Sequence, residues 1–135
     1  MTNRFIGKLL VPLLIVTALT AVGCSAAASG AQDEFTESKA LQQAELYVEY
    51  SPTFIYDGID QSLKLVETLY PDTENTWQFV FQFESRHSGY GDRDGQILLQ
   101  VITPHEVIIT IQDGEVTTAI MDSVWDMVNQ DLIDG

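Results

Sequence analysis

The segment TWQFVFQFESRH, residues 76–87, alternates between two kinds of side chain. Successive residues of a strand point to opposite faces, so this period of two predicts a half-buried β-strand. We expect one face to lie in the core beneath a helix, because aromatic rings bury large apolar areas. The alternative is a ligand platform of exposed rings. The aromatic face would carry Trp77, Phe79, Phe81 and Phe83, and the opposite face Gln78, Val80, Gln82 and Glu84.

An amphipathic helix is predicted earlier in the chain, over residues 35–50. Asp33 or Thr36 can cap its start, and Ser51 before Pro52 disfavours its continuation. Its apolar residues recur three and four positions apart, which is the spacing of one helix face: Ala40, Leu41, Ala44, Tyr47 and Val48.

Further strands are predicted where β-branched and aliphatic residues dominate, at residues 62–70, 96–103, 106–112 and 115–121. Asp113 and Gly114 should join the last two as a hairpin, since both central positions of a type I′ turn require a positive φ. The segment YPDTEN, residues 70–75, reads as another turn. Pro104 is expected to end one strand and begin the next, because a central strand needs every N–H.

A short C-terminal helix is predicted from Asp122 or Ser123, with an apolar face made by Val124, Trp125, Val128 and Leu132. The predicted fold is therefore α+β, with the first helix packed on an antiparallel meander of four or five strands. Helix, meander and the DGEV hairpin at residues 113–116 together resemble the cystatin-like architecture, and PepSY-type secreted domains in particular. This resemblance implies a binding or protease-inhibiting role outside the cytoplasm, without enzymatic activity.

The first 23 residues have the organisation of a secretory signal peptide. MTNRFIGK carries Arg4 and Lys8, and LLVPLLIVTALTAVG follows without a charge. This run is too short for a membrane-spanning helix, which needs about 20 apolar residues. The segment AVGC resembles the lipobox of bacterial lipoproteins, which implies a lipid on Cys24, the only cysteine. Ala21 departs from the aliphatic residue usual there, so cleavage by ordinary signal peptidase is the alternative. An unpaired structural thiol would be a liability in a secreted protein.

Residues 24–34 then read as a lipidated flexible tether, spanning at most about 35 Å when extended. Residues 35–135 would form a single domain. A chain beginning at Cys24 keeps four basic residues against 20 acidic ones, a formal net charge of −16. Such a surface repels phosphate backbones and anionic headgroups, which excludes nucleic acid as a partner. It also excludes electrostatic attachment to the membrane, so we expect the lipid on Cys24 to anchor the protein. The acidity also suits a salt-rich habitat or simple solubility.

The glycine-rich segment SRHSGYGDRDGQ, residues 85–96, is the candidate site within the domain. Asp92 and Asp94 have the spacing of calcium loops, but a complete EF-hand loop needs further ligands and a distal glutamate. Ca²⁺ is the only cofactor that the sequence suggests. The alternative is a hairpin loop of solvated charges.

An acidic rim is predicted if Pro104 reverses the chain, because three turns would then meet at one end of the sheet. The rim could bind a cation or a basic peptide, or consist of ordinary turn residues. In this arrangement His87 and His105 lie at opposite ends, roughly 30 Å apart. The predicted rim consists of Asp57, Asp60, His87, Tyr90, Asp92, Asp94, Asp113 and Glu115.

Two functions follow from these patterns. The first is a lipid-anchored binding or inhibitory module of the cell envelope. The second is a small extracytoplasmic hydrolase centred on His87, with Ser85 or Ser88 as the nearby hydroxyl. A serine nucleophile needs an adjacent base held by a third group, and no nucleophile-elbow motif is present, so we assign no catalytic residue.

Overall fold

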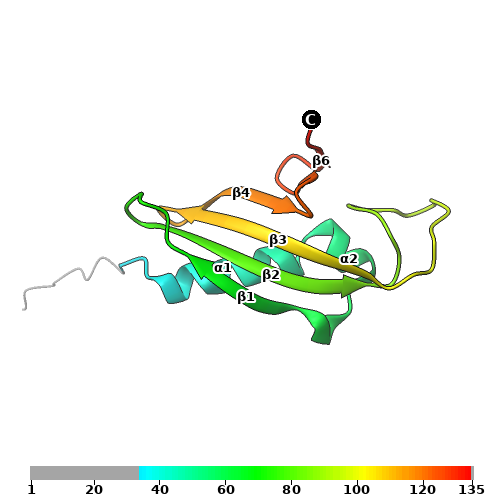
Figure 1. Ribbon diagram of the computed structural model, residues 1–135, viewed down its shortest axis with the longest axis horizontal. Coiled ribbons are helices and arrows are strands. Elements are labelled where there is room, and N and C mark those ends of the chain that lie inside the picture. The colour runs from blue at the N-terminus through cyan, green and yellow to red at the C-terminus, as the bar shows by residue number, and fades with distance from the viewer. Residues whose placement is uncertain (1–33, 135) are drawn as a thin grey trace, which may run out of the picture. The chain divides into compact units, whose positions relative to one another are not determined.

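The computed structural model describes residues 34–134, which all lie in one compact unit. The predicted signal peptide and the lipid acceptor Cys24 lie outside the described residues, as does almost all of the tether. Within residues 34–134, no helix is long enough and apolar enough to cross a membrane. The described part is α+β, a helical layer packed on an antiparallel sheet, as the sequence predicts (Figure 1).

The first helix, α1, spans Glu37–Glu49, and its start is fixed by Thr36, whose hydroxyl accepts the N–H of Lys39. Its buried face consists of Ala40, Ala44 and Val48, which confirms the predicted helix. A second helix, α2, spans Pro52–Asp57. The sequence analysis predicted only that the first helix ends before Pro52, and did not predict this helix. Proline is compatible with the first turn of a helix, and the Ser51 hydroxyl caps this turn by accepting the N–H of Phe54.

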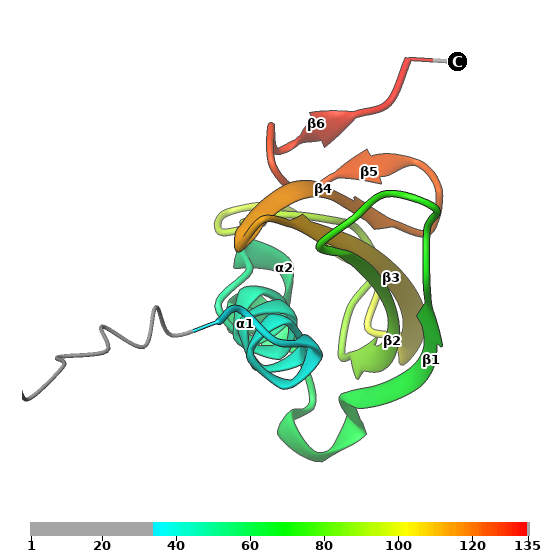
Figure 2. The ribbon, with the colours of Figure 1, turned by 90° about the vertical axis from the view of Figure 1, so that its left-hand side faces the viewer.

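The sheet contains six antiparallel strands in chain order. They are β1 (Lys64–Leu69), β2 (Thr76–Ser85), β3 (Thr103–Gln112), β4 (Glu115–Met121), β5 (Trp125–Asp126) and β6 (Asp131–Leu132), with a short 3₁₀ turn, η1 (Asp60–Ser62), before β1. The predicted hairpin is confirmed, since Asp113 and Gly114 have φ of 50° and 84° between β3 and β4. Figure 2 shows the sheet curving around α1.

The core lies between α1 and the inner face of β2, β3 and β4. Phe79, Phe81 and Phe83 are at most 1% exposed, so the aromatic face is core and not a ligand platform. The inner residues of the neighbouring strands complete the cluster: Val107, Ile109, Ile111, Ala119 and Met121. Alternate residues of β2 and β3 therefore face away from the helix, toward the outer surface of the sheet.

The predicted strand at 96–103 is wrong. Residues 86–102 form a long loop instead, and β2 pairs with β3 from Ser85 opposite Thr103. Pro104 lies inside β3 opposite Glu84 and does not reverse the chain. This position tolerates proline because β4 ends opposite Val107, so β3 has only β2 beside it there.

The predicted C-terminal helix is also wrong. Asp122 and Ser123 have φ of 52° and 62°, which turns the chain back on β4 before a helix can begin. A second turn follows β5, where Asp126 Oδ1 accepts the N–H groups of Val128 and Asn129. The short strands β5 and β6 thus replace the helix, and Trp125 packs against the core.

Candidate functional site

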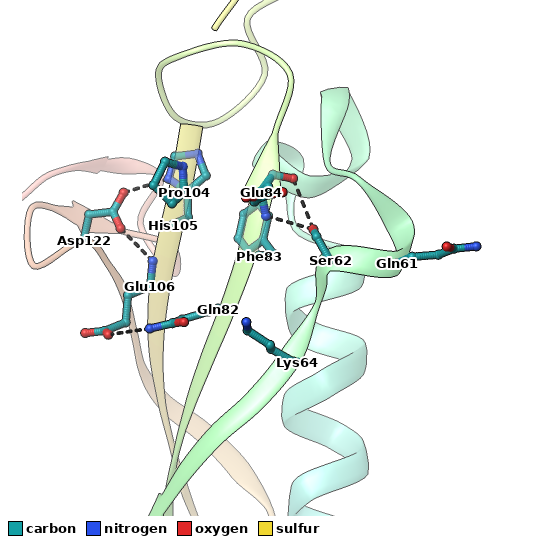
Figure 3. Close-up of a pocket in the computed structure, with 10 residues that line it drawn as sticks. All are labelled: Gln61, Ser62, Lys64, Gln82, Phe83, Glu84, Pro104, His105, Glu106 and Asp122. Carbon is teal, nitrogen blue, oxygen red and sulfur yellow. Dashed lines mark hydrogen bonds and ion pairs between the residues drawn. The ribbon is translucent and has the colours of Figure 1, made fainter. Parts of the chain in front are cut away.

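Polar side chains gather at the end of the sheet where β2 stops and β3 starts. They form an open depression of about 510 Å³ (Figure 3). Gln82, Glu84 and Glu106 alternate with buried residues along β2 and β3, so they lie on the face away from α1. The remaining lining comes from Gln61, Ser62, Lys64, Phe83, Pro104, His105 and Asp122.

The floor of the depression is held by side-chain hydrogen bonds that Figure 3 makes visible. Gln82 Nε2 donates to Glu106 Oε2 at 3.3 Å, across the β2–β3 pair. The hydroxyl of Ser62 accepts the N–H of Glu84 at 2.8 Å, which ties η1 to the end of β2. These bonds fix two strands and a turn relative to each other, so the surface is largely preformed.

Behind the depression, His105 lies between a serine and an aspartate. Its Nε2 is 3.0 Å from Ser85 Oγ, and its Nδ1 is 2.7 Å from Asp122 Oδ2. The order hydroxyl, imidazole, carboxylate is that of a catalytic triad. Ser85, however, is fully buried, and its hydroxyl donates to the carbonyl oxygen of His87 at 2.6 Å. A hydroxyl that is buried and already donating cannot attack a substrate carbonyl in this conformation.

The protons of this group follow from its hydrogen bonds. The Ser85 hydroxyl donates to a carbonyl and keeps its lone pairs for Nε2 of His105, while Nδ1 of the ring faces the Asp122 carboxylate. Both ring nitrogens therefore have a polar partner within the fold. The arrangement is satisfied without a substrate, which favours a structural role.

Asp122 and Tyr90 have shifted pKa values. Burial acts to raise the pKa of Asp122, but hydrogen bonds from His105, the Glu106 amide and Tyr90, with the charge of His105, together hold it below its ordinary value. Burial raises the pKa of Tyr90 to about 12, aided by the charge of Asp122 and the hydrogen bond to it. Tyr90 also stacks on Trp125, with ring centroids 5.5 Å apart. Asp122 is therefore anchored as an anion and Tyr90 as a neutral donor.

The loop beyond the sheet is built around Arg93, which is 1% exposed. Its guanidinium lies 4.6 Å from the ring centroid of Tyr56, and Nη2 lies 2.7 Å from Asp57 Oδ1. The other hydrogen bonds from Arg93 go to the carbonyl oxygens of Thr53, His87, Ser88, Gly89 and Gly91. A buried charge needs such full pairing, and the pairing gives residues 86–93 a defined shape.

Glycine is required at one point of this loop. Gly91 has φ of 69°, and a Cβ there would lie 3.2 Å from the Trp125 ring. Its N–H donates to the Thr53 hydroxyl at 2.7 Å, so the backbone must approach α2 closely.

Of the predicted rim, the structure brings only part together. Asp57 Oδ2 lies 2.8 Å from His87 Nδ1, and the Tyr90 hydroxyl donates to Asp122 Oδ2 at the same end of the sheet. Asp60 begins η1 at the same end of the sheet. Asp92 and Asp94 are exposed on the loop and linked by the bond from Asp94 N–H to Asp92 Oδ1.

The rest of the rim prediction is wrong. Asp113 and Glu115 lie at the opposite end, where Asn75 Nδ2 donates to Asp113 Oδ1. Because β3 begins at Thr103 and runs antiparallel to β2, it ends at Gln112 opposite Thr76, next to the turn between β1 and β2. His105 lies beside Ser85 and not far from His87, so the predicted separation of the two histidines is wrong as well. Among residues 34–134, no three histidine, cysteine or carboxylate side chains are grouped to hold a metal ion.

Sequence reasoning missed the roles of Arg93 and of the His105–Asp122 pair. Arg93 lies between two aspartates in the chain, which suggested a solvated charge. Its one usable signal was an arginine close to three glycines, Gly89, Gly91 and Gly95, where backbone carbonyls can converge on a donor.

Comparisons with protein-family models, with curated proteins and with solved structures found no match. What this site can bind is therefore inferred from its own residues.

Proposed function

We propose that this chain is a binding or inhibitory module, held at the extracytoplasmic face of a membrane by a lipid on Cys24, and that its depression binds a basic, extended peptide segment. The observation that carries the proposal is the composition of the depression. It offers amide, hydroxyl and carboxylate groups on a fixed surface, while the hydroxyl nearest a histidine is buried.

Charge defines the kind of partner. Asp122 is already engaged by His105, which leaves Glu84 and Glu106 against Lys64, the one lysine or arginine among the described residues that line the depression. The whole chain has a formal net charge of −14, so a cationic partner is attracted from a distance and anionic ones are repelled. An extended peptide suits an open surface crossed by β-strands, because its backbone can bond to the amide and carboxylate groups there.

Two other observations support an envelope module. AVGC at the end of an apolar run resembles a lipobox, and the small polar segment after it would act as a tether. The leading helix on an antiparallel sheet has the element order of cystatin-like and PepSY-type domains, which bind or inhibit other proteins. This last argument is an analogy of fold, and fold alone does not fix function.

A hydrolase is the second candidate, but the residue aligned with Ser85 and Asp122 is His105 and not His87, on which the sequence prediction was centred. His87 bonds through its ring to Asp57, and only its carbonyl oxygen contacts Ser85. A fluorophosphonate probe separates the candidates, since it labels only serines that are accessible and activated. We expect no labelling of Ser85. Labelling that is lost in His105→Gln would favour the hydrolase.

The test of binding uses two fluorescent octapeptides, one alternating Lys with Val and one alternating Glu with Val. We expect only the lysine peptide to bind, and Glu84→Gln with Glu106→Gln to weaken it about tenfold, a loss of about 1.4 kcal/mol. The matched control is Glu74→Gln with Glu115→Gln, two exposed acids distant from the depression that change the net charge equally. Equal weakening by both double variants would mean non-specific charge attraction and would overturn the proposal.

A further inference from the structure

The second half of the 86–102 loop exposes an unusual amount of apolar surface. Residues 96–102, QILLQVI, are named the apolar arm here. Ile97 is fully exposed at 104%, Leu99 is 73% exposed, and Val101 and Ile102 are each more than half exposed. Figure 1 shows this loop projecting beyond the end of the sheet, away from the start of α1. Contiguous apolar exposure of this kind marks an interaction surface.

The backbone of the apolar arm is also largely unpaired. Among residues 34–134, its backbone bonds are Gln96 N–H to the Arg93 carbonyl, Val101 N–H to the Leu99 carbonyl, and the Thr103 hydroxyl to the Val101 carbonyl. The sequence has the composition of a strand, yet β2 is already paired with β3. The arm is thus a strand-forming segment without a strand partner, the kind of segment that adds to another chain.

The base of the arm is held firmly. Arg93 and its carbonyl partners order the first half of the loop, and Thr103 pairs with Ser85 at the other end. Gln100 and Ile102 line a shallow depression of about 390 Å³ with Ile59 and His87. The side chains at 97, 99 and 101 alternate with these two, so in an extended arm they point the other way.

We propose that the apolar arms of two copies of this chain pair as antiparallel strands across a two-fold axis at Leu99. A symmetric pairing centred there places Leu99 opposite Leu99 and Ile97 opposite Val101, and so joins the exposed side chains of both copies on one face.

Charge repulsion between two copies is weakest at the apolar arm. A chain with 20 acidic and six basic residues repels itself over most of its surface. No residue between Gln96 and Thr103 carries a charge, so two arms meet without opposing like charges. The proposal does not depend on the depression or on its ligand.

Disulfide trapping tests the arrangement, because the register predicts which residues of the two copies lie opposite each other. Two Leu99 residues on the axis have Cα atoms about 4.5–5.5 Å apart, within disulfide range. Two Ile97 residues are offset by four positions, about 13 Å. The chain beginning at Ser25 contains no cysteine and retains the whole compact unit with its core, so single cysteines can be placed in it.

We expect Leu99→Cys to form a disulfide-linked dimer at least about tenfold faster than Ile97→Cys in a glutathione buffer. Ile55→Cys on α2 is the matched control, an exposed apolar site outside the arm, and should also be slow. Ile97→Asn with Val101→Asn should remove the advantage of Leu99→Cys, with circular dichroism confirming that the fold is kept.

Oxidation of Leu99→Cys no faster than Ile55→Cys would overturn the proposal, and so would equal rates at positions 97 and 99. A third outcome is membrane docking: an environment-sensitive dye on Leu99→Cys that shifts with phosphatidylcholine vesicles, without dimer formation, would also overturn it.

Discussion

Nη2 of Arg93 lies 2.7 Å from Oδ1 of Asp57, and the two side chains are only 2% and 6% exposed. The pair joins the 86–102 loop to α2, and the second oxygen of Asp57 reaches His87. The same guanidinium collects five backbone carbonyls. This side chain therefore organises the end of the sheet that carries both proposed surfaces.

Replacing the arginine should be strongly destabilising. Arg93→Met leaves the carboxylate of Asp57 buried without its cation, which typically reduces the free energy of unfolding by about 3–5 kcal/mol. Asp57→Asn added to Arg93→Met should lose less than the sum of the single changes, because the two groups are coupled. Urea unfolding measures both losses. Lys64→Met, at an exposed position, is the control and should stay within about 0.5 kcal/mol of the wild type. A loss below about 1 kcal/mol for Arg93→Met would contradict the structural role.

The aromatic core makes a second prediction. Phe81 is 1% exposed between α1 and the sheet, so Phe81→Ala should reduce the free energy of unfolding by about 3–5 kcal/mol. Gln82→Ala, one residue further on the outer face, should change it by less than about 1 kcal/mol. Similar urea midpoints for the two variants would show that the ring is not buried.

The raised pKa of Tyr90 predicts that the folded state loses stability at alkaline pH. Its pKa is raised to about 12 in the folded chain, while an unfolded tyrosine titrates near the ordinary pKa of 10.0. Between these values the unfolded state loses the proton first, so stability is complete below about pH 10 and falls up to about pH 12. Tyr90→Phe should flatten this part of the melting-temperature profile, and Tyr50→Phe on the surface should not. An unchanged slope in Tyr90→Phe would refute the assignment.

The lipid anchor is tested in cells. Cys24→Ala should move the protein from the detergent phase to soluble or uncleaved forms, because the thiol is the proposed acceptor. Intact-mass analysis of the wild type should find the added lipid on a chain beginning at Cys24. An unmodified N-terminus at another residue would remove the anchor from the proposed function.

Local patterns predicted the parts of this fold that depend on neighbouring residues. Phe79, Phe81 and Phe83 repeat with the strand period, and Asp113 with Gly114 satisfies a turn that needs two positive φ values. The strand signal of residues 96–102 is equally local, but strand composition does not say which partner is present. The partner of β2 is set by long-range pairing, where Thr103 meets Ser85.

The site was harder to predict because its residues meet only through that pairing. His105 reaches Ser85 across the β2–β3 pair, and Asp122 reaches it from the turn after β4. That turn has positive φ at Asp122 and Ser123, which non-glycine residues adopt infrequently. The sequence pattern therefore indicated the start of a helix and not a turn.

The central claim is that the outer depression binds a basic, extended peptide. Amide chemical shifts of the isotope-labelled domain, recorded while the Lys–Val octapeptide is added, test it most directly. The account predicts saturable shifts at Lys64, Gln82, Glu84 and Glu106, with little change at Gly114 and Glu115. Shifts centred on the Gly114 end, or none at saturating peptide, would contradict it.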